Sequence, residues 1–160
     1  MKVKIRIINP EKEERADLYV HHEDKSMKDL TEYLEHDMFR SVILICSRDK
    51  EIVKVESQNI LYIESVMEKQ IVHLLENSKI QEESKDYITK KRLYELERIL
   101  PSSFVRISKS IIVNSDRIRV FKPMFNGMME ITLDNDENIY ISRKYLKEVR
   151  NKIMEVNYSE

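Results

Sequence analysis

The most informative segment of the chain reads FVRISKSIIVN, from Phe104 to Asn114. Both of its halves are rich in valine, isoleucine and phenylalanine, and a polar Ser-Lys pair separates them. Short runs of β-branched and aromatic residues with a polar break are typical of two strands joined by a tight turn. The segment therefore predicts strands over 104–107 and 110–114, with Lys109 between them.

The same pattern extends in both directions along the chain. Short runs rich in valine, isoleucine and tyrosine alternate with turns of Asn, Asp, Ser and Lys, which predicts a mainly β fold. We expect strands over residues 42–47, 51–56, 60–66, 70–75, 79–82, 104–107, 110–114, 117–122, 128–133 and 138–141. No repeat or long linker interrupts them, so residues 42–154 form one predicted domain and residues 155–160 a C-terminal tail.

Two short helices interrupt these strands. Apolar residues at steps of three and four predict one helix over 89–100, which ends before Pro101. The same spacing predicts a second helix over 143–154, which begins after Ser142.

The composition changes near residue 41, so residues 1–41 form a separate N-terminal segment. Apolar and basic side chains alternate at its start, which predicts a half-buried strand over 2–8, and Leu18 and Val20 indicate a second short strand. A helix begins with Ser26 as its N-cap, because apolar residues then recur at helical spacing: Met27, Leu30, Leu34 and Met38. The segment is thus predicted as strand–strand–helix.

Glycine occurs once in 160 residues, at Gly127. Phosphate-binding loops need several glycines so that the backbone can approach an anion. This scarcity argues against P-loop NTPases, Rossmann dinucleotide binders and kinases. The Asn126-Gly127 pair instead predicts a type I′ hairpin turn.

The remaining reactive side chains form no catalytic or metal-binding pattern. The single cysteine, Cys46, ends an apolar strand and is expected to be buried. The four histidines lack the paired spacing of zinc ligands, and no set of residues has the spacing of a catalytic triad. We therefore expect no enzyme activity, metal or cofactor.

Neither a signal peptide nor a membrane span is visible in the sequence. The first residues lack an apolar core, and the longest aliphatic runs are far shorter than the ~20 residues that span a bilayer. We expect a cytoplasmic protein that is not inserted in a membrane.

The formal net charge of −1 conceals two basic clusters. Residues 101–122 contain five basic side chains and one acidic side chain, and so do residues 143–152, which gives each a net charge of +4. Each cluster could be an ordinary solvated face, or the two together could form a basic surface for nucleic acid. Charge alone leaves both interpretations open.

Four segments, in order, resemble the LytTR family of bacterial DNA-binding domains. They are ILYIES (60–65), LYELE (93–97) with the following Leu-Pro (100–101), FVRISKSIIVN (104–114) with Ile118, and IYISRKY (139–145). The resemblance covers residues 42–154, about 70% of the chain. It implies an elongated stack of small antiparallel sheets with short helices, which inserts loops from one edge into successive major grooves of DNA.

The resemblance also implies three positions that face DNA: the turn from Val66 to Gln70, Lys109 and Arg143. Lys69 and Gln70 are the polar candidates in that turn, and a simple solvated hairpin is the alternative. Arginine can form a bidentate pair with guanine, whereas a lysine here can reach a guanine edge or a phosphate. Three further cations are expected to neutralise phosphates: Arg106, Lys144 and Lys147.

Because family members bind tandem repeats as dimers, the resemblance also implies a homodimer. Only about 40 residues precede the domain, too few for the receiver domain that many members carry, so we expect a stand-alone regulator. Residues 1–41 would either form the dimer or pack on their own domain.

We therefore expect a sequence-specific transcription regulator that binds a repeated operator in double-stranded DNA. The alternative is a protein-interaction or sensory module that retains the fold and titrates another regulator or a membrane partner. Lys109 and Arg143 on one basic edge favour the regulator, because an interaction module has no need of such an edge.

Overall fold

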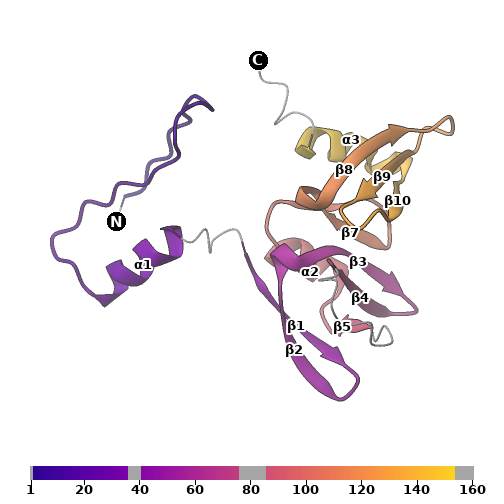
Figure 1. Ribbon diagram of the computed structural model, residues 1–160, viewed down its shortest axis with the longest axis horizontal. Helices are drawn as coiled ribbons and strands as arrows, with labels where there is room; N and C mark the ends of the chain where they lie inside the picture. Colours follow the sequence, from indigo (N-terminus) through magenta and orange to yellow (C-terminus); the bar gives the residue numbers. More distant parts are fainter. Residues whose placement is uncertain (1, 36–40, 76–85, 154–160) are drawn as a thin grey trace. The chain divides into compact units, whose positions relative to one another are not determined.

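The computed structural model describes residues 2–35, 41–75 and 86–153 (Figure 1). Contacts divide the chain into two units, Met1–Phe39 and Arg40–Glu160, and we describe each by itself. The strand predicted over 79–82 and the tail over 155–160 lie outside the described residues.

The larger unit contains a seven-stranded antiparallel sheet and a three-stranded antiparallel sheet. The first has the order β2-β1-β5-β4-β3-β7-β6 and the second the order β10-β9-β8. The strands of the first are β1 (Ile43–Arg48), β2 (Glu51–Glu56), β3 (Ile60–Val66), β4 (Lys69–Leu74), β5 (Tyr87–Thr89), β6 (Phe104–Arg106) and β7 (Ile111–Asn114). Those of the second are β8 (Ile118–Pro123), β9 (Met129–Leu133) and β10 (Asn138–Ile141). The mainly β prediction is confirmed.

Short helices accompany these sheets. They are α2 (Leu93–Ile99) and α3 (Arg143–Ile153), with single 3₁₀ turns at η2 (Ser57–Asn59) and η3 (Ser115–Arg117). The helix predicted over 89–100 begins later than expected, because Thr89 ends the short strand β5. A strand of three residues is too short for an alternating pattern to reveal it.

Strands β3, β7 and β6, at one end of the seven-stranded sheet, are buried on both faces. On one face, Ile63 and Ile112 pack with Leu96 of α2 in a first core. On the other face, Val113 packs with Ile131 of the second sheet in a second core, which also includes Val149 of α3. Figure 1 shows the second sheet and α3 beyond β7, on the side away from β1 and β2.

The first core also contains Cys46, which is buried as predicted. Burial raises the pKa of its thiol to about 11, because the thiolate would lose its hydration. The thiol is therefore protonated at neutral pH.

Tyr62 joins the two sheets through its hydroxyl group. The hydroxyl donates a 2.7 Å hydrogen bond to Glu137, in the turn between β9 and β10. Its ring stacks on His73 of β4, with centroids 4.0 Å apart and an interplanar angle of 12°. Burial, followed by the hydrogen bond to the carboxylate, raises the pKa of Tyr62.

The smaller unit corrects the N-terminal prediction. Residues 2–24 contain no strand, and Val3, Ile5 and Ile7 are 80%, 91% and 99% exposed. Alternation alone makes no strand, because the backbone must pair with a neighbour and one face must be covered. The predicted helix is confirmed as α1 (Lys25–Glu35), but Asp24 caps it, not Ser26: the Asp24 carboxylate accepts a 2.9 Å bond from the amide of Met27.

The type I′ turn predicted at Asn126-Gly127 is also wrong. A type I′ turn needs positive φ at both central residues, and among the residues of this loop only Gly127 has one, at +76°. Met124 accepts a bond from the Gly127 amide and donates one to Met128, which makes a three-residue loop with a bulge. The two-residue type I′ geometry occurs instead at Met67 and Glu68, whose φ values are 45° and 65°.

His73 should make the stability of the larger unit depend on pH. Burial lowers the pKa of its imidazole, against the opposing charges of Glu137, Glu64 and Asp86. The unfolded chain then binds the proton more readily, so stability should fall as the pH drops through about 6.5 and below. In His73→Gln the slope of unfolding free energy against pH, measured by urea denaturation between pH 7.5 and 5, should decrease by up to ~1.4 kcal/mol per pH unit.

His22→Gln is the matched control, since His22 is exposed in the other unit and its substitution should leave the slope unchanged. An unaltered slope in His73→Gln would contradict the assigned role of burial.

Candidate nucleic-acid interface

Lys109 lies at the tip of the hairpin that joins β6 and β7. The amide of Ile107 donates a 3.0 Å bond to the carbonyl of Ile111, which closes the hairpin. Within the turn, the Ser108 hydroxyl accepts a 3.2 Å bond from the amide of Ser110. The Lys109 side chain is exposed.

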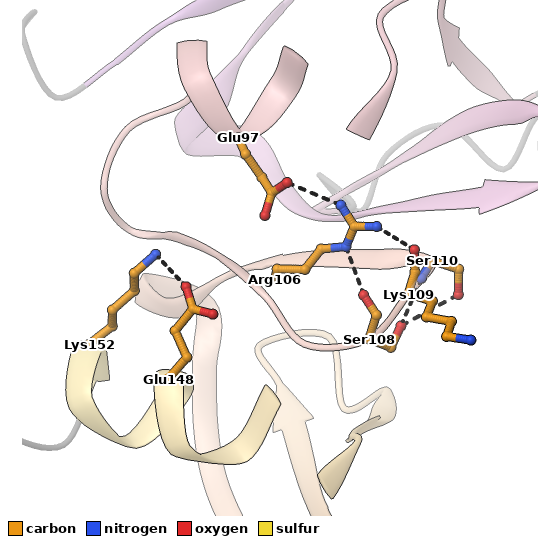
Figure 2. Close-up of polar contacts among 7 residues, drawn as sticks. All are labelled: Glu97, Arg106, Ser108, Lys109, Ser110, Glu148 and Lys152. Carbon is orange, nitrogen blue, oxygen red and sulfur yellow. Dashed lines mark hydrogen bonds and ion pairs between the residues drawn. The ribbon is translucent and has the colours of Figure 1, made fainter. Parts of the chain in front are cut away.

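Arg106 lies beneath this tip and faces the protein. Its Nε donates a 2.7 Å bond to the carbonyl of Ser108, and its guanidinium also bonds the carbonyl of Lys109 (Figure 2). A third contact, 3.2 Å long, joins it to the Glu97 carboxylate of α2. The side chain is only 17% exposed, so the expected phosphate contact by Arg106 does not fit its placement.

The turn between β3 and β4 separates its two polar candidates. Lys69 is exposed at the start of β4. Gln70 is buried, and its amide donates a 3.1 Å bond to the Ser65 hydroxyl. A buried amide with its donor engaged is poorly placed to read a base, so Gln70 serves the turn and Lys69 remains the candidate of this loop.

Arg143 is the first residue of α3, is exposed, and lies against Gly127 of the β8–β9 loop. A Cβ added at Gly127 would meet the Cδ of Arg143 at 3.3 Å and its Nε at 3.8 Å. The glycine therefore serves two needs, because it adopts a positive φ and leaves space for the arginine stem.

Hydrogen bonds connect the three candidate loops along one edge of the unit. The backbone amide of Ser65 donates a 2.7 Å bond to the carbonyl of Ser110. The hydroxyl of the same serine accepts the bond from Gln70. On the other side of the same hairpin, the carbonyl of Ile107 accepts a 2.9 Å bond from the amide of Ser142. The hairpin of Lys109 is thus bonded on one side to the strand that leads into the Lys69 turn and on the other side to the residue before Arg143.

The basic cluster over 101–122 is largely neutralised in the folded protein. Four of its five cations have a carboxylate partner: Arg106 with Glu97, Arg117 with Asp134 at 3.4 Å, Arg119 with Asp136, and Lys122 with Glu130 at 3.7 Å. Within the described residues, Lys109 is the cation of this cluster that has no ion pair. The four acidic partners offset the net charge of +4 that the sequence suggests, so the exposed positive charge that is left without a carboxylate partner in the described residues lies at Lys109.

The second basic cluster keeps most of its charge. Lys152 pairs with Glu148 at 3.2 Å, whereas no ion pair in the described part of the chain involves Arg143, Lys147 or Arg150. These three lie at steps of four and three and share one exposed face of α3. Lys144, also exposed, lies over the ring of Tyr145 at 5.7 Å.

Sequence reasoning missed the supporting residues of this edge. Gln70 and Arg106 were expected at the DNA surface because of their polarity, and Gly127 was treated only as a turn residue. The strand period contained a usable signal for Arg106, since it pairs with Ile112, whose side chain faces the core beside α2.

No group of three or more His, Cys, Asp or Glu side chains in the described residues could hold a metal ion. None of the helices in residues 2–35, 41–75 and 86–153 has the length and apolar character needed to cross a membrane.

Comparison with known proteins identifies similar chains. The family model of the LytTr DNA-binding domain matches residues 50–154. An uncharacterized HTH-type transcriptional regulator of Staphylococcus aureus strain NCTC 8325 / PS 47 is 33% identical over 118 residues, which are 74% of this chain and 75% of the relative. Its counterpart in strain MRSA252 is 32% identical over the same length.

A solved structure shows the same fold. It is the LytTr DNA-binding domain of a Bacillus cereus protein, with a TM-score of 0.60 and 23% sequence identity. The match covers 69% of this chain and 94% of the solved chain.

Gly127 should be sensitive to any side chain. Gly127→Ala should destabilise the larger unit by about 1–2 kcal/mol, because alanine resists a positive φ and its Cβ would press on the Arg143 stem. Gly127→Asn is the matched comparison, since asparagine tolerates this φ but still adds a Cβ. Urea denaturation should rank wild type above Gly127→Asn and Gly127→Asn above Gly127→Ala; equal stabilities would refute this account.

Proposed function

The chain belongs to the family of LytTr DNA-binding domains, and we propose that it is a sequence-specific bacterial transcription regulator. In this proposal it binds double-stranded DNA through the loops that carry Lys69, Lys109 and Arg143, and it acts as a regulator, not as an enzyme. The observation that carries the proposal is the hydrogen-bonded edge that places Lys109 and Arg143 on neighbouring segments, both exposed and both without an ion pair among the described residues.

The position of the helices supports readout by loops. Five strands separate α2 from α3, and five separate α1 from α2, so the described residues contain no helix–turn–helix. The transcriptional role named for the Staphylococcus aureus relatives supports the same conclusion for this chain.

Each cation has a role that follows from its chemistry. Arg143 presents a bidentate fork that suits the O6 and N7 atoms of guanine in a major groove. Lys109 reaches either a base edge or a phosphate. Lys144 and Lys147, on the exposed side of α3, neutralise phosphates and make the affinity depend on salt. Insertion of these loops into successive major grooves fits a repeated operator, and a protein with this task works in the bacterial cytoplasm.

Residues 1–41 are proposed to form a homodimer. α1 buries none of its residues, and the N-terminal residues described before it include no buried side chain. A segment of this size that buries no residue needs an apolar partner. A second copy supplies one by self-complementarity, and it would also place two DNA-binding domains on a repeated site.

Removal of residues 1–41 tests the dimer. Size-exclusion chromatography with light scattering should give a dimer mass for the full chain and a monomer mass for the shortened chain. A full chain that is monomeric, or a shortened chain that stays dimeric, would contradict this role and favour packing on the chain's own domain or an interface elsewhere.

Arg143 provides the test of sequence-specific binding. Selection from a random DNA pool should enrich a repeated motif, and Arg143→Ala should weaken binding to that motif by about 1–3 kcal/mol and relax one base position. Arg143→Lys keeps the charge but lacks the fork, so it should retain affinity for unrelated duplex and lose the base preference.

Lys50→Ala is the matched control, because Lys50 is an exposed cation in the β1–β2 turn, outside the proposed interface. Failure to enrich a motif would favour the protein-interaction or sensory module over the regulator.

A further inference from the structure

Arg106 has an unusual position for a cation near a proposed DNA surface. We propose that Arg106 is a positioning residue, which fixes the Ser108–Ser110 turn from below and thereby presents Lys109 to DNA, with Glu97 as its anchor. This inference rests on the proposed function and adds a residue that acts on DNA through Lys109.

The strand register explains why Arg106 points inward. Arg106 pairs with Ile112, and Ile112 pairs with Ile63, so the three residues share one face of the sheet. The two isoleucines are buried in the core beneath α2. Arg106 is the end of this row, and its side chain therefore meets Glu97 on α2 and not the solvent.

The guanidinium joins two successive backbone carbonyls of the turn. Nε bonds the Ser108 carbonyl at 2.7 Å, and the terminal nitrogen bonds the Lys109 carbonyl. One planar, rigid group with several donors can hold both oxygens at once, which a lysine with its single nitrogen cannot do in the same geometry. In Figure 2 the Lys109 side chain points away from the guanidinium.

Glu97 completes the arrangement from the other side. Its carboxylate lies 3.2 Å from the guanidinium, and α2 is held in place by the buried Leu93 and Leu96. The ion pair neutralises Arg106, which leaves Lys109 as the cation that the hairpin offers to DNA. Ordering this turn before binding also removes a cost of fixing the backbone at the moment of contact.

A double-mutant cycle tests whether Arg106 acts through Lys109. Wild type, Arg106→Gln, Lys109→Ala and the double variant are titrated with a 30-base-pair random-sequence duplex and with the selected operator. Arg106→Gln should weaken operator binding about fivefold in the wild-type background and less than about twofold in the Lys109→Ala background. If Arg106 itself touched a phosphate, the two losses would multiply, and that result would overturn the proposal.

Arg119→Gln is the matched control for the loss of a cation. Arg119 is in the same basic cluster, is paired with Asp136 and is 48% exposed. Its substitution should have the same small effect with and without Lys109. Arg106→Lys should recover only part of the operator affinity, because it keeps the charge near Glu97 but not both carbonyl bonds. If Arg106→Gln does not fold, Arg106→Lys replaces it in the double-mutant cycle.

Hydrogen exchange provides a readout without DNA. In Arg106→Gln the amide of Ser110 should exchange faster than in wild type, while the amide of Ile112 in the core should not change. Unchanged exchange at Ser110 would overturn the proposal that Arg106 fixes the turn. If the wild-type chain binds neither duplex, the proposed function is refuted, and so is the presentation of Lys109 to DNA. The hydrogen exchange of Ser110 would then report only on whether Arg106 orders the turn.

Discussion

The larger unit depends on the burial of β3, β6 and β7 on both faces. In β6 and β7 the side chains alternate between the core beneath α2 and the core shared with the second sheet and α3, and in β3 an irregularity between Ile60 and Tyr62 places both Leu61 and Tyr62 in the second core. A shift of one residue in β6 or β7 would move its whole set of side chains to the opposite core. Burying each large aliphatic side chain contributes about 1.5–3 kcal/mol, so the register is strongly fixed.

The proposed DNA-binding edge takes its geometry from this fixed register. Ser65 and Ser110 sit at or near the ends of the buried strands, and Ile107 begins the turn that follows β6. Because their backbone bonds connect the loops to these strands, the positions of the loops that carry Lys69, Lys109 and Arg143 depend on the register of the core. A site held by rigid elements in this way can present cations with the accuracy that base readout needs.

Local patterns predicted the larger unit well and the charges poorly. Alternation and turn residues found nine of the ten described strands and both of its helices, because those signals lie within a few residues of each other. Ion pairs such as Arg117 with Asp134 join residues far apart in sequence, and no local pattern contains them.

The prediction of N-terminal strands is wrong for a related reason. Alternation shows which side chains a strand could bury, but not whether another strand is present to pair with it. Gln70 shows the same limit, because polarity predicted exposure while the Ser65 hydroxyl made burial tolerable.

The neutralised cluster bears directly on how such an edge would discriminate between DNA sequences. Every unpaired cation that meets a phosphate strengthens binding to all sequences alike. In the segment over 101–122, carboxylates from α2, β9 and the β9–β10 turn pair with four cations, so in the proposed interface that segment would add little affinity for an arbitrary duplex. In the proposed interface, Lys109 and Arg143 would then supply the contacts whose geometry can be selective, and Lys144 and Lys147 those to phosphates. The near-zero net charge is consistent with a specific DNA-binding protein. Specificity is the difference between the affinity for the operator and the affinity for other DNA, and acidic partners of the cations lower the second.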